Sequence, residues 1–208
     1  VNAAAGKKFF GVLDLNNGYW QLPLHEDSQR FFSIRTDAGV WTPVRLIQGS
    51  RNAAGPFQAV VCDAIGDLVN RSCVVYIDDI LIFGETERQF VNNWIDVLTR
   101  LHNKGFKVNA KKTQFYAKEV RYCGRIFSAE GVKFDQSLIK SLTEMAPPTN
   151  AADLRTYLAT CNWLRTSIPR YAEVIAPLQQ VLNAALAQVV NKTKKDAAKK
   201  LLLEEAGW

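Results

Sequence analysis

The chain has 208 residues, of which 48% are hydrophobic and 22% charged, proportions that are typical of a soluble globular protein with one or two domains. The net charge of +6 and the pI near 9.2 favour a polyanionic partner. Four cysteines without paired spacing and two scattered histidines argue against a zinc centre or a disulfide framework, and no apolar run approaches the roughly 18 residues of a membrane span. We therefore expect an intracellular protein, and because Val1 is not a start methionine we expect a fragment or a processed product.

The first two thirds of the chain predict strands and helices in irregular order. Apolar runs bounded by turn residues predict strands at residues 8–15, 31–35, 40–46, 74–83, 113–116 and 121–127. Helical spacing of apolar residues begins near Pro56, and a capping box at residues 86–89 opens a second helix that Gly105 closes. Because strands and helices do not alternate regularly, the order indicates an α+β fold, an antiparallel sheet with helices on one face.

The last third predicts a small helical unit. Asp135 can cap a helix over residues 136–145, Asn150 can cap a second that Pro169 ends, and residues 171–183 form a third. From residue 184 onward the chain is rich in Ala and Lys and predicts a solvated linker with a marginal helix.

Carboxylates in apolar surroundings are the strongest chemical signal. Residues 74–83 predict a tight hairpin with Asp78 and Asp79 at its tip, and Asp14 lies inside the first apolar run. Asp-Asp is also a good turn sequence, so this pair alone leaves a purely structural role open. A carboxylate within a strand is costly unless it is paired or binds a metal. If the two strands are neighbours, the three acids converge on one site that suits Mg²⁺.

These segments resemble the motifs of reverse transcriptases, in particular those of gypsy-type LTR retrotransposons. The similar segments follow one another in the family's order over roughly residues 8–183, at residues 13–21 (motif A), 48–58 (motif B), 76–79 (motif C), 104–115 (motif D) and 122–131 (motif E, the primer grip). The resemblance implies an antiparallel-sheet polymerase palm with packed helices, followed by a small helical thumb. It divides the chain into a palm with the later fingers at 1–134, a thumb at 135–183, and a linker at 184–208 toward a missing RNase H domain.

The resemblance also assigns roles to individual residues. It implies an RNA-directed DNA polymerase that transfers a nucleotide from a dNTP to a primer 3′-hydroxyl with two Mg²⁺ ions, which Mn²⁺ can replace. The implied catalytic and metal-binding residues are Asp14, Asp78 and Asp79, with the carbonyl of Leu15 as a further ligand. The implied nucleotide-binding residues are Tyr19, Gln48, Gly49, Lys111 and Lys112, and the implied primer grip is Tyr122, Cys123 and Gly124.

The implied partners are an RNA or DNA template with its primer, and dNTP. The run from Arg100 to Arg125 holds eight basic residues and one acid, which fits a groove for a nucleic-acid backbone but is also typical of a solvated face. About a dozen residues precede Asp14, so the upstream fingers, whose basic residues clamp the triphosphate in the family, would come from a homo- or hetero-oligomer. We expect a cytoplasmic particle or the nucleus as the location.

Two alternatives stay open. The chain could be a catalytically inactive retroelement remnant that binds nucleic acid or acts as a scaffold, or an unrelated Mg²⁺-dependent phosphotransfer domain with paired acids. Intact carboxylates at Asp14, Asp78 and Asp79 argue against simple decay, and the ordered motifs argue against an unrelated domain.

Overall fold

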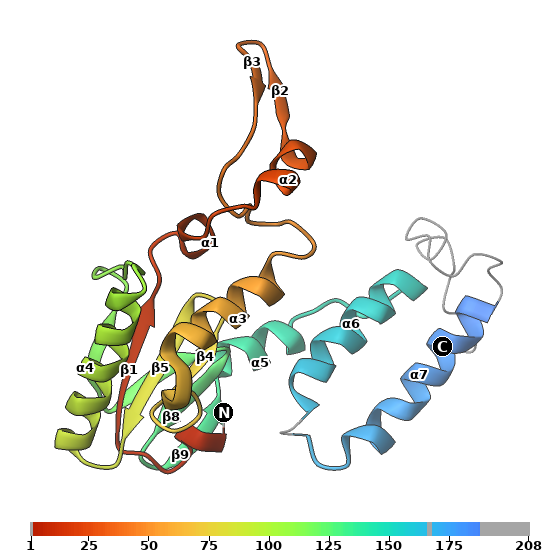
Figure 1. The fold of residues 1–208 in the computed structure, drawn as a ribbon. Helices are drawn as coiled ribbons and strands as arrows, with labels where there is room; N and C mark the ends of the chain where they lie inside the picture. The colour runs from red at the N-terminus through yellow and green to blue at the C-terminus, as the bar shows by residue number, and fades with distance from the viewer. Residues whose placement is uncertain (1, 166–167, 188–208) are drawn as a thin grey trace. The chain divides into compact units, whose positions relative to one another are not determined.

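The computed structural model describes residues 2–165 and 168–187, in two compact units that span residues 1–133 and 134–208. The first unit is a mixed α/β structure whose sheets are antiparallel, as predicted (Figure 1). Its strands are β1 (Phe9–Asp14), β2 (Ile34–Thr36), β3 (Gly39–Trp41), β4 (Cys73–Tyr76), β5 (Asp79–Gly84), β6 (Gln114–Ala117), β7 (Glu119–Tyr122), β8 (Arg125–Ser128) and β9 (Gly131–Phe134). Its α-helices are α1 (Gly18–Gln21), α2 (Glu26–Gln29), α3 (Ala54–Ile65) and α4 (Glu87–Asn103).

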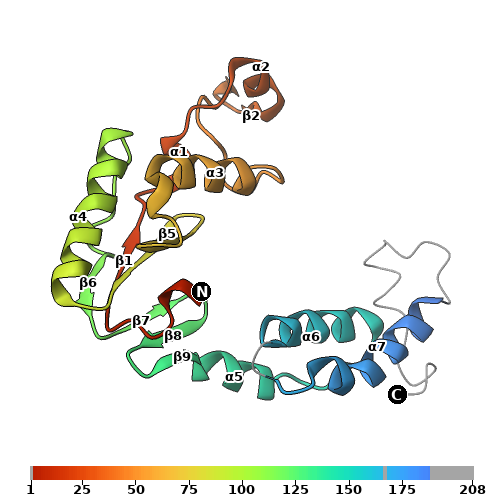
Figure 2. The same cartoon turned by 60° about the horizontal axis from the view of Figure 1, so that its bottom comes forward.

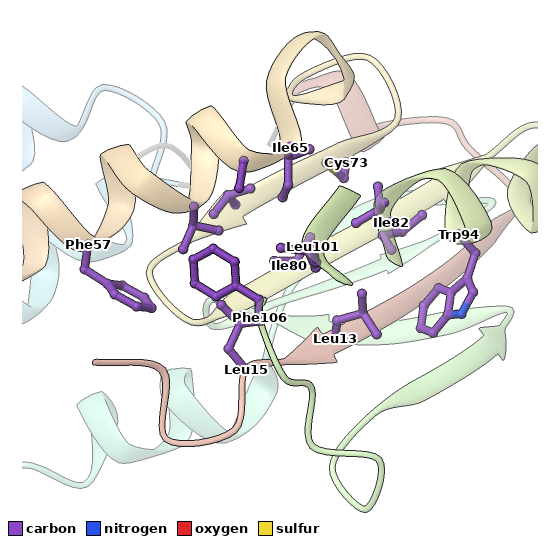
Figure 3. Close-up of a cluster of buried hydrophobic side chains, with 14 of the residues drawn as sticks. Leu13, Leu15, Phe57, Ile65, Cys73, Ile80, Ile82, Trp94, Leu101 and Phe106 are labelled. Carbon is purple, nitrogen blue, oxygen red and sulfur yellow. The ribbon is translucent and has the colours of Figure 1, made fainter. Parts of the chain in front are cut away.

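The central sheet has the order β4-β5-β1-β6, and its two middle strands are covered on both faces. Period-two alternation sends Leu13 and Ile80 to one face, where α3 and α4 cover them (Figure 3). The other face carries Phe10 and Leu81, which pack against β7 and β8. Burial on both faces explains why β1 and β5 are nearly continuous apolar runs in the sequence.

Local sequence signals account for both ends of α4, which packs on the central sheet. Thr86 caps α4 by accepting a hydrogen bond from the backbone N–H of Gln89, and the helix is followed by Gly105 in the left-handed region with φ 80°. Its inner face carries Phe90, Trp94, Val97 and Leu101 at steps of three and four. The described residues contain no helix that combines the length and the apolar character needed to cross a membrane.

Two separate small sheets complete the first unit. Strands β2 and β3 form a hairpin around Asp37 and Ala38 that extends away from the central sheet (Figures 1 and 2), and its large apolar residues, including Ile34 and Trp41, are exposed. Strands β7, β8 and β9 form the other sheet. The prediction of one strand over residues 121–127 is wrong: Cys123 and Gly124, both at positive φ, form a two-residue turn between β7 and β8.

The second unit contains the helices α5 (Gln136–Thr143), α6 (Ala151–Trp163) and α7 (Tyr171–Ala187). Asp135 and Asn150 cap α5 and α6 as predicted, and α6 packs on α7 through Leu154, Leu158 and Leu182. The predicted linker starts too early, because α7 continues through Ala187, with Ala185 buried against α6. Residues 188–208 of that linker lie outside the described part of the chain.

Gly84 at the end of β5 allows α4 to approach the sheet, and this contact is testable. A Cβ atom at Gly84 would lie 2.6 Å from the backbone nitrogen of Phe90, which cannot move without moving the helix. We predict that Gly84→Ala lowers the free energy of unfolding by about 2–3 kcal/mol. Gly55→Ala, in the first turn of α3 with no atom within 4 Å of the added Cβ, should be neutral or stabilise by up to about 0.5 kcal/mol. Urea unfolding of both variants measures this, and a wild-type midpoint for Gly84→Ala would contradict the packing.

Candidate functional site

Two of the three predicted acids face each other across the middle of the central sheet. Asp14 ends β1 and pairs in register with Asp79, the first residue of β5. Residues that lie opposite in an antiparallel pair share a face, with Cβ atoms about 4.5–5.5 Å apart. Asp14 has 14% of its side chain exposed and Asp79 is half-buried. The face that carries Phe10 and Leu81 at one end is therefore acidic at the other.

This arrangement concentrates negative charge. Burial, followed by the charges of Asp78 and Asp14, raises the pKa of the Asp79 carboxyl above its ordinary value, and only the nearby Lys112 opposes this among the groups that act on it. The Lys112 Nζ lies 3.5 Å from Asp14 Oδ1, but the lysine side chain is exposed, so its charge screens the acids weakly. The three carboxylates thus carry more negative charge than their surroundings neutralise, which favours a cation beside them.

The hairpin between β4 and β5 turns one residue earlier than predicted. Tyr76 pairs with Asp79, so the two-residue loop is Ile77-Asp78 and not Asp78-Asp79. The register with β1 fixes Asp79 inside the strand, which shifts the loop. Ile77 has φ 57°, a left-handed conformation that is costly for a β-branched residue.

Gln58 of α3 holds this strained turn. Its Oε1 accepts a hydrogen bond from the backbone N–H of Ile77 at 2.5 Å, and its Nε2 donates to the carbonyl of Val75 at 3.1 Å. Gln58 is missing from the predicted site residues; its position at the end of the segment that resembles motif B is the signal that could have found it.

The segment after β1 forms one wall of the site. Gly18 opens α1, and a Cβ atom there would lie 2.7 Å from the Phe57 ring and 3.2 Å from the Cβ of Asp78, so only glycine lets this turn approach both. The Tyr19 ring stacks on Phe57 with centroids 4.7 Å apart. Tyr19 is thereby fixed beside the acids by a buried aromatic ring.

Residues 107–113, which precede β6 and carry Lys111 and Lys112 (the lysine loop), are joined to the end of β1 and the turn after it by backbone hydrogen bonds. The N–H of Asn109 donates to the carbonyl of Asp14 at 2.8 Å, and the N–H of Asn16 donates to the carbonyl of Lys107 at 2.9 Å. The side chain of Gln21 donates to the carbonyls of Asn16 and Lys107 and accepts from the N–H of Lys107. These contacts bring Lys112 to Asp14, and the sequence pattern did not indicate the role of Gln21.

A pocket of about 210 Å³ opens where these pieces meet, lined by Asp14, Leu15, Asn16, Asn17, Gly18, Tyr19, Trp20, Gln48, Asp78, Asn109 and Lys112. It brings together six of the predicted site residues: Asp14, Leu15, Tyr19, Gln48, Asp78 and Lys112. Gly49, Lys111, Asp79 and the turn at residues 122–124 are not part of its lining, and Asn109 lines it without having been predicted. The volume is below the roughly 300–1,000 Å³ of pockets that enclose a whole small molecule, so a nucleotide would be only partly enclosed.

The predicted primer-grip residues lie beside Asp79. The Tyr122 hydroxyl shares its single hydrogen between the carbonyl oxygens of Val74 at 3.1 Å and Asp79 at 3.2 Å. Burial, with a smaller contribution from the charge of Asp79, raises the pKa of both the Tyr122 phenol and the Cys123 thiol. Both groups are therefore neutral at physiological pH, and Cys123 is not an activated nucleophile.

Within residues 2–165 and 168–187, no three acidic, histidine or cysteine side chains gather closely enough to hold a metal ion by themselves. The donor set nevertheless fits Mg²⁺, since Asp14 and Asp78 line one polar pocket together with Leu15. Mg²⁺ usually keeps several waters and uses one or two protein carboxylates, with substrate phosphates completing its shell.

The burial of Asp79, together with repulsion from Asp78 and Asp14, is expected to have a measurable effect on stability. The pKa of Asp79 is higher in the folded chain than its ordinary 3.8, so the protonated form is favoured by folding. The associated stability is present below about pH 3.8 and is lost as pH rises through the folded pKa. We therefore predict that Asp79→Asn raises the free energy of unfolding in metal-free buffer at about pH 7, with little difference at about pH 3. Urea unfolding at both pH values with a chelator present measures this; a variant less stable than wild type at neutral pH would contradict it.

Comparison with known proteins identifies the family of the chain. Residues 1–127 match the reverse transcriptase (RNA-dependent DNA polymerase) family. The chain is 32% identical over 98% of its length to the retrovirus-related Pol polyprotein from transposon gypsy of Drosophila melanogaster, of which it covers 19%. It therefore spans about a fifth of the length of that curated relative.

Solved structures show the same likeness. A foamy viral protease-reverse transcriptase in complex with double-stranded DNA matches with a TM-score of 0.76 and 26% identity, over 86% of this chain and 31% of the viral chain. The foamy viral protein in complex with an RNA/DNA hybrid matches with a TM-score of 0.73 and 26% identity, over 96% of this chain and 26% of the viral chain. The family match covers more than half of the chain, including the residues that line the acidic pocket. The chain belongs to the reverse transcriptase (RNA-dependent DNA polymerase) family.

Proposed function

We propose that this chain carries the polymerase centre of a retrotransposon polyprotein and extends a primer on an RNA or DNA template. The observation that carries the proposal is the single pocket that collects Asp14, Tyr19, Gln48, Asp78 and Lys112 from four separate segments. Chemically similar residues occur together by chance in many proteins, but these are the residues that the resemblance to the family singled out beforehand.

In this proposal Asp14, Asp78 and the carbonyl of Leu15 hold divalent cations, with Asp79 as a weaker partner beside them. Two Mg²⁺ ions, replaceable by Mn²⁺, would activate the primer 3′-hydroxyl and stabilise the leaving pyrophosphate. The chain itself supplies the negative charge that binds the cations and the rigid strands that fix it, β1 and β5. Most of the catalysis is then positioning and neutralisation of charge.

Four residues that line the pocket or adjoin it in the sequence are proposed to act on the nucleotide. The Tyr19 ring would lie under the sugar and exclude a 2′-hydroxyl. Its stacking on Phe57 supports this role, because a stacked ring cannot easily move away from a 2′-hydroxyl. Gln48 and Gly49 would contact the nucleotide, and Gly49 has the φ of 90° that glycine adopts readily. Of the two candidate lysines for protonating pyrophosphate, the pocket favours Lys112 over Lys111.

The nucleic-acid partners are proposed from the primer-grip turn and from the relatives. The turn of Cys123 and Gly124, with Tyr122, would hold the primer end beside Asp79. The foamy viral proteins with the same fold bind double-stranded DNA and an RNA/DNA hybrid. A template with its primer is the corresponding partner here, together with dNTP.

The domain assignment is part of the same proposal. Residues 1–134 would form the palm with the later fingers. Residues 135–183 would form the thumb, which the observed end of α7 extends to Ala187. The remainder would be a linker toward an RNase H domain. The exposed apolar side chains of the β2–β3 hairpin support further polypeptide, from the same or another subunit, packing there as the rest of the fingers. The protein would act inside the cell, in a cytoplasmic particle or the nucleus.

Primer extension by the full chain tests the proposal. On a poly(rA)/oligo(dT) duplex with Mg²⁺ and dTTP, we predict extension that Asp14→Asn and Asp78→Asn each lower by at least about 100-fold, because either change removes a charge at the reacting phosphate. The matched control is Asp96→Asn, an exposed acid on α4 that is not part of the pocket lining, which should keep wild-type activity.

The inactive-remnant alternative predicts a different result. Salt-sensitive duplex binding that the two substitutions leave unchanged, with no extension by the wild-type chain, would contradict polymerase activity and favour a binding module.

A further inference from the structure

The hydroxyl of Tyr122 joins two separate parts of the first unit. Tyr122 ends β7, which belongs to the sheet β7-β8-β9, whereas its two acceptors belong to the central sheet. Val74 lies on β4 and Asp79 on β5, so one hydroxyl contacts both strands of the hairpin that carries Asp78 and Asp79.

The Tyr122 ring leaves this hydroxyl little freedom. The residue is 4% exposed and packs in the cluster of Phe10, Leu81 and Phe127, with the Phe127 ring edge-on at 6.2 Å between centroids. A side chain enclosed in this way has one position for its terminal atom. The hydroxyl therefore fixes the distance between the end of β7 and the β4–β5 hairpin.

Tyr122 immediately precedes the turn between β7 and β8, so its contact with the β4–β5 hairpin also affects the position of that turn. Tyr122 pairs with Arg125, so Cys123 and Gly124 form the whole loop, and both have positive φ, 48° and 72°. Positive φ at both loop residues is the pattern of the type I′ turn, which matches the twist of the strands and gives a short, rigid hairpin end. An anchor one residue before such a turn sets where the turn lies.

We propose that Tyr122 is a positioning residue whose hydroxyl sets the spacing between the β7–β8 turn and the carboxylates of the β4–β5 hairpin. The inference rests on the proposed function for its catalytic consequence: the turn holds the primer end, and the spacing places the primer 3′-hydroxyl against the pocket of Asp14 and Asp78. It assigns the hydroxyl a role in alignment, separate from contact with the primer.

The test is Tyr122→Phe, which keeps the buried ring and removes only the hydroxyl. Hydrogen exchange of the full chain, followed by mass spectrometry, measures the coupling without any activity: we expect faster exchange in peptides from both hairpins, residues 72–84 and 119–128, and unchanged exchange in α4. Tyr116→Phe is the matched control, because it removes an exposed tyrosine hydroxyl whose partner is Glu87, the first residue of α4.

Single-turnover primer extension at saturating duplex measures the catalytic consequence. We expect Tyr122→Phe to lower the maximal rate by about 10- to 100-fold, as misalignment of reacting groups by about 1 Å does, and to leave the dNTP concentration for half-maximal rate within about twofold. A merely structural role would lower the amount of active enzyme and leave the rate per active site unchanged.

The outcomes separate this inference from the proposed function. Unchanged exchange in the two hairpins, or an unchanged rate per active site in an active enzyme, would overturn the role of the hydroxyl. If the wild-type chain extends no primer, the exchange experiment alone decides: faster exchange confined to the two hairpins supports the positioning contact although the polymerase proposal has failed.

Discussion

The pairing of β1 with β5 places Asp14 directly against Asp79, and the architecture of the site depends on this register. A shift of β1 by one residue against β5 would send Asp14 to the face covered by α3 and α4 and would turn Leu13 away from that core. The apolar residues on both faces therefore enforce a pairing that is electrostatically unfavourable at its acidic end. The core stabilises the fold, and the repulsion among the acids is retained where a cation could offset it.

Three neutral polar side chains around the site bind backbone groups rather than the acids. Gln21 holds the lysine loop, Gln58 holds the strained turn at Ile77, and Tyr122 contacts both strands of the same hairpin. Each of these contacts fixes the position of a carboxylate or a lysine without donating a hydrogen bond to a carboxylate oxygen. This arrangement keeps the acids available for cations and substrate, and it explains how pieces from distant parts of the sequence keep a defined geometry.

Much of the fold follows from local patterns. The capped helix α4, the acidic hairpin and the antiparallel sheet were predictable because periodicity, caps and apolar runs are local. The position of the turn at Ile77 was not, because the register with β1, a partner about 65 residues away, decides it. Cys123 at positive φ also escaped prediction, since cysteine carries none of the turn preference of Asn or Gly. The four-residue helix α1 is too short to show a period.

The same distinction applies to the site. Asp14, Asp78, Tyr19, Gln48 and Lys112 were identifiable from motif resemblance, and the structure collects them in one pocket. Gln21 was not, because a glutamine that binds distant backbone groups leaves no pattern in a single sequence; Gln58 lies in the segment that resembles motif B, but its hydrogen bonds to the turn at Ile77 are visible only in the structure. Only the tertiary structure identifies residues whose function is to hold other residues.

Direct observation of a divalent cation at the acids tests the central claim best. Mn²⁺ titrated into the isotopically labelled full chain broadens the amide NMR signals nearest to where it binds. We predict that the signals of Asp14, Leu15 and Asp78 broaden first, and that Asp14→Asn abolishes this selective effect. Early broadening at other acids, or equal broadening throughout the chain, would show that the three carboxylates do not form a cation site.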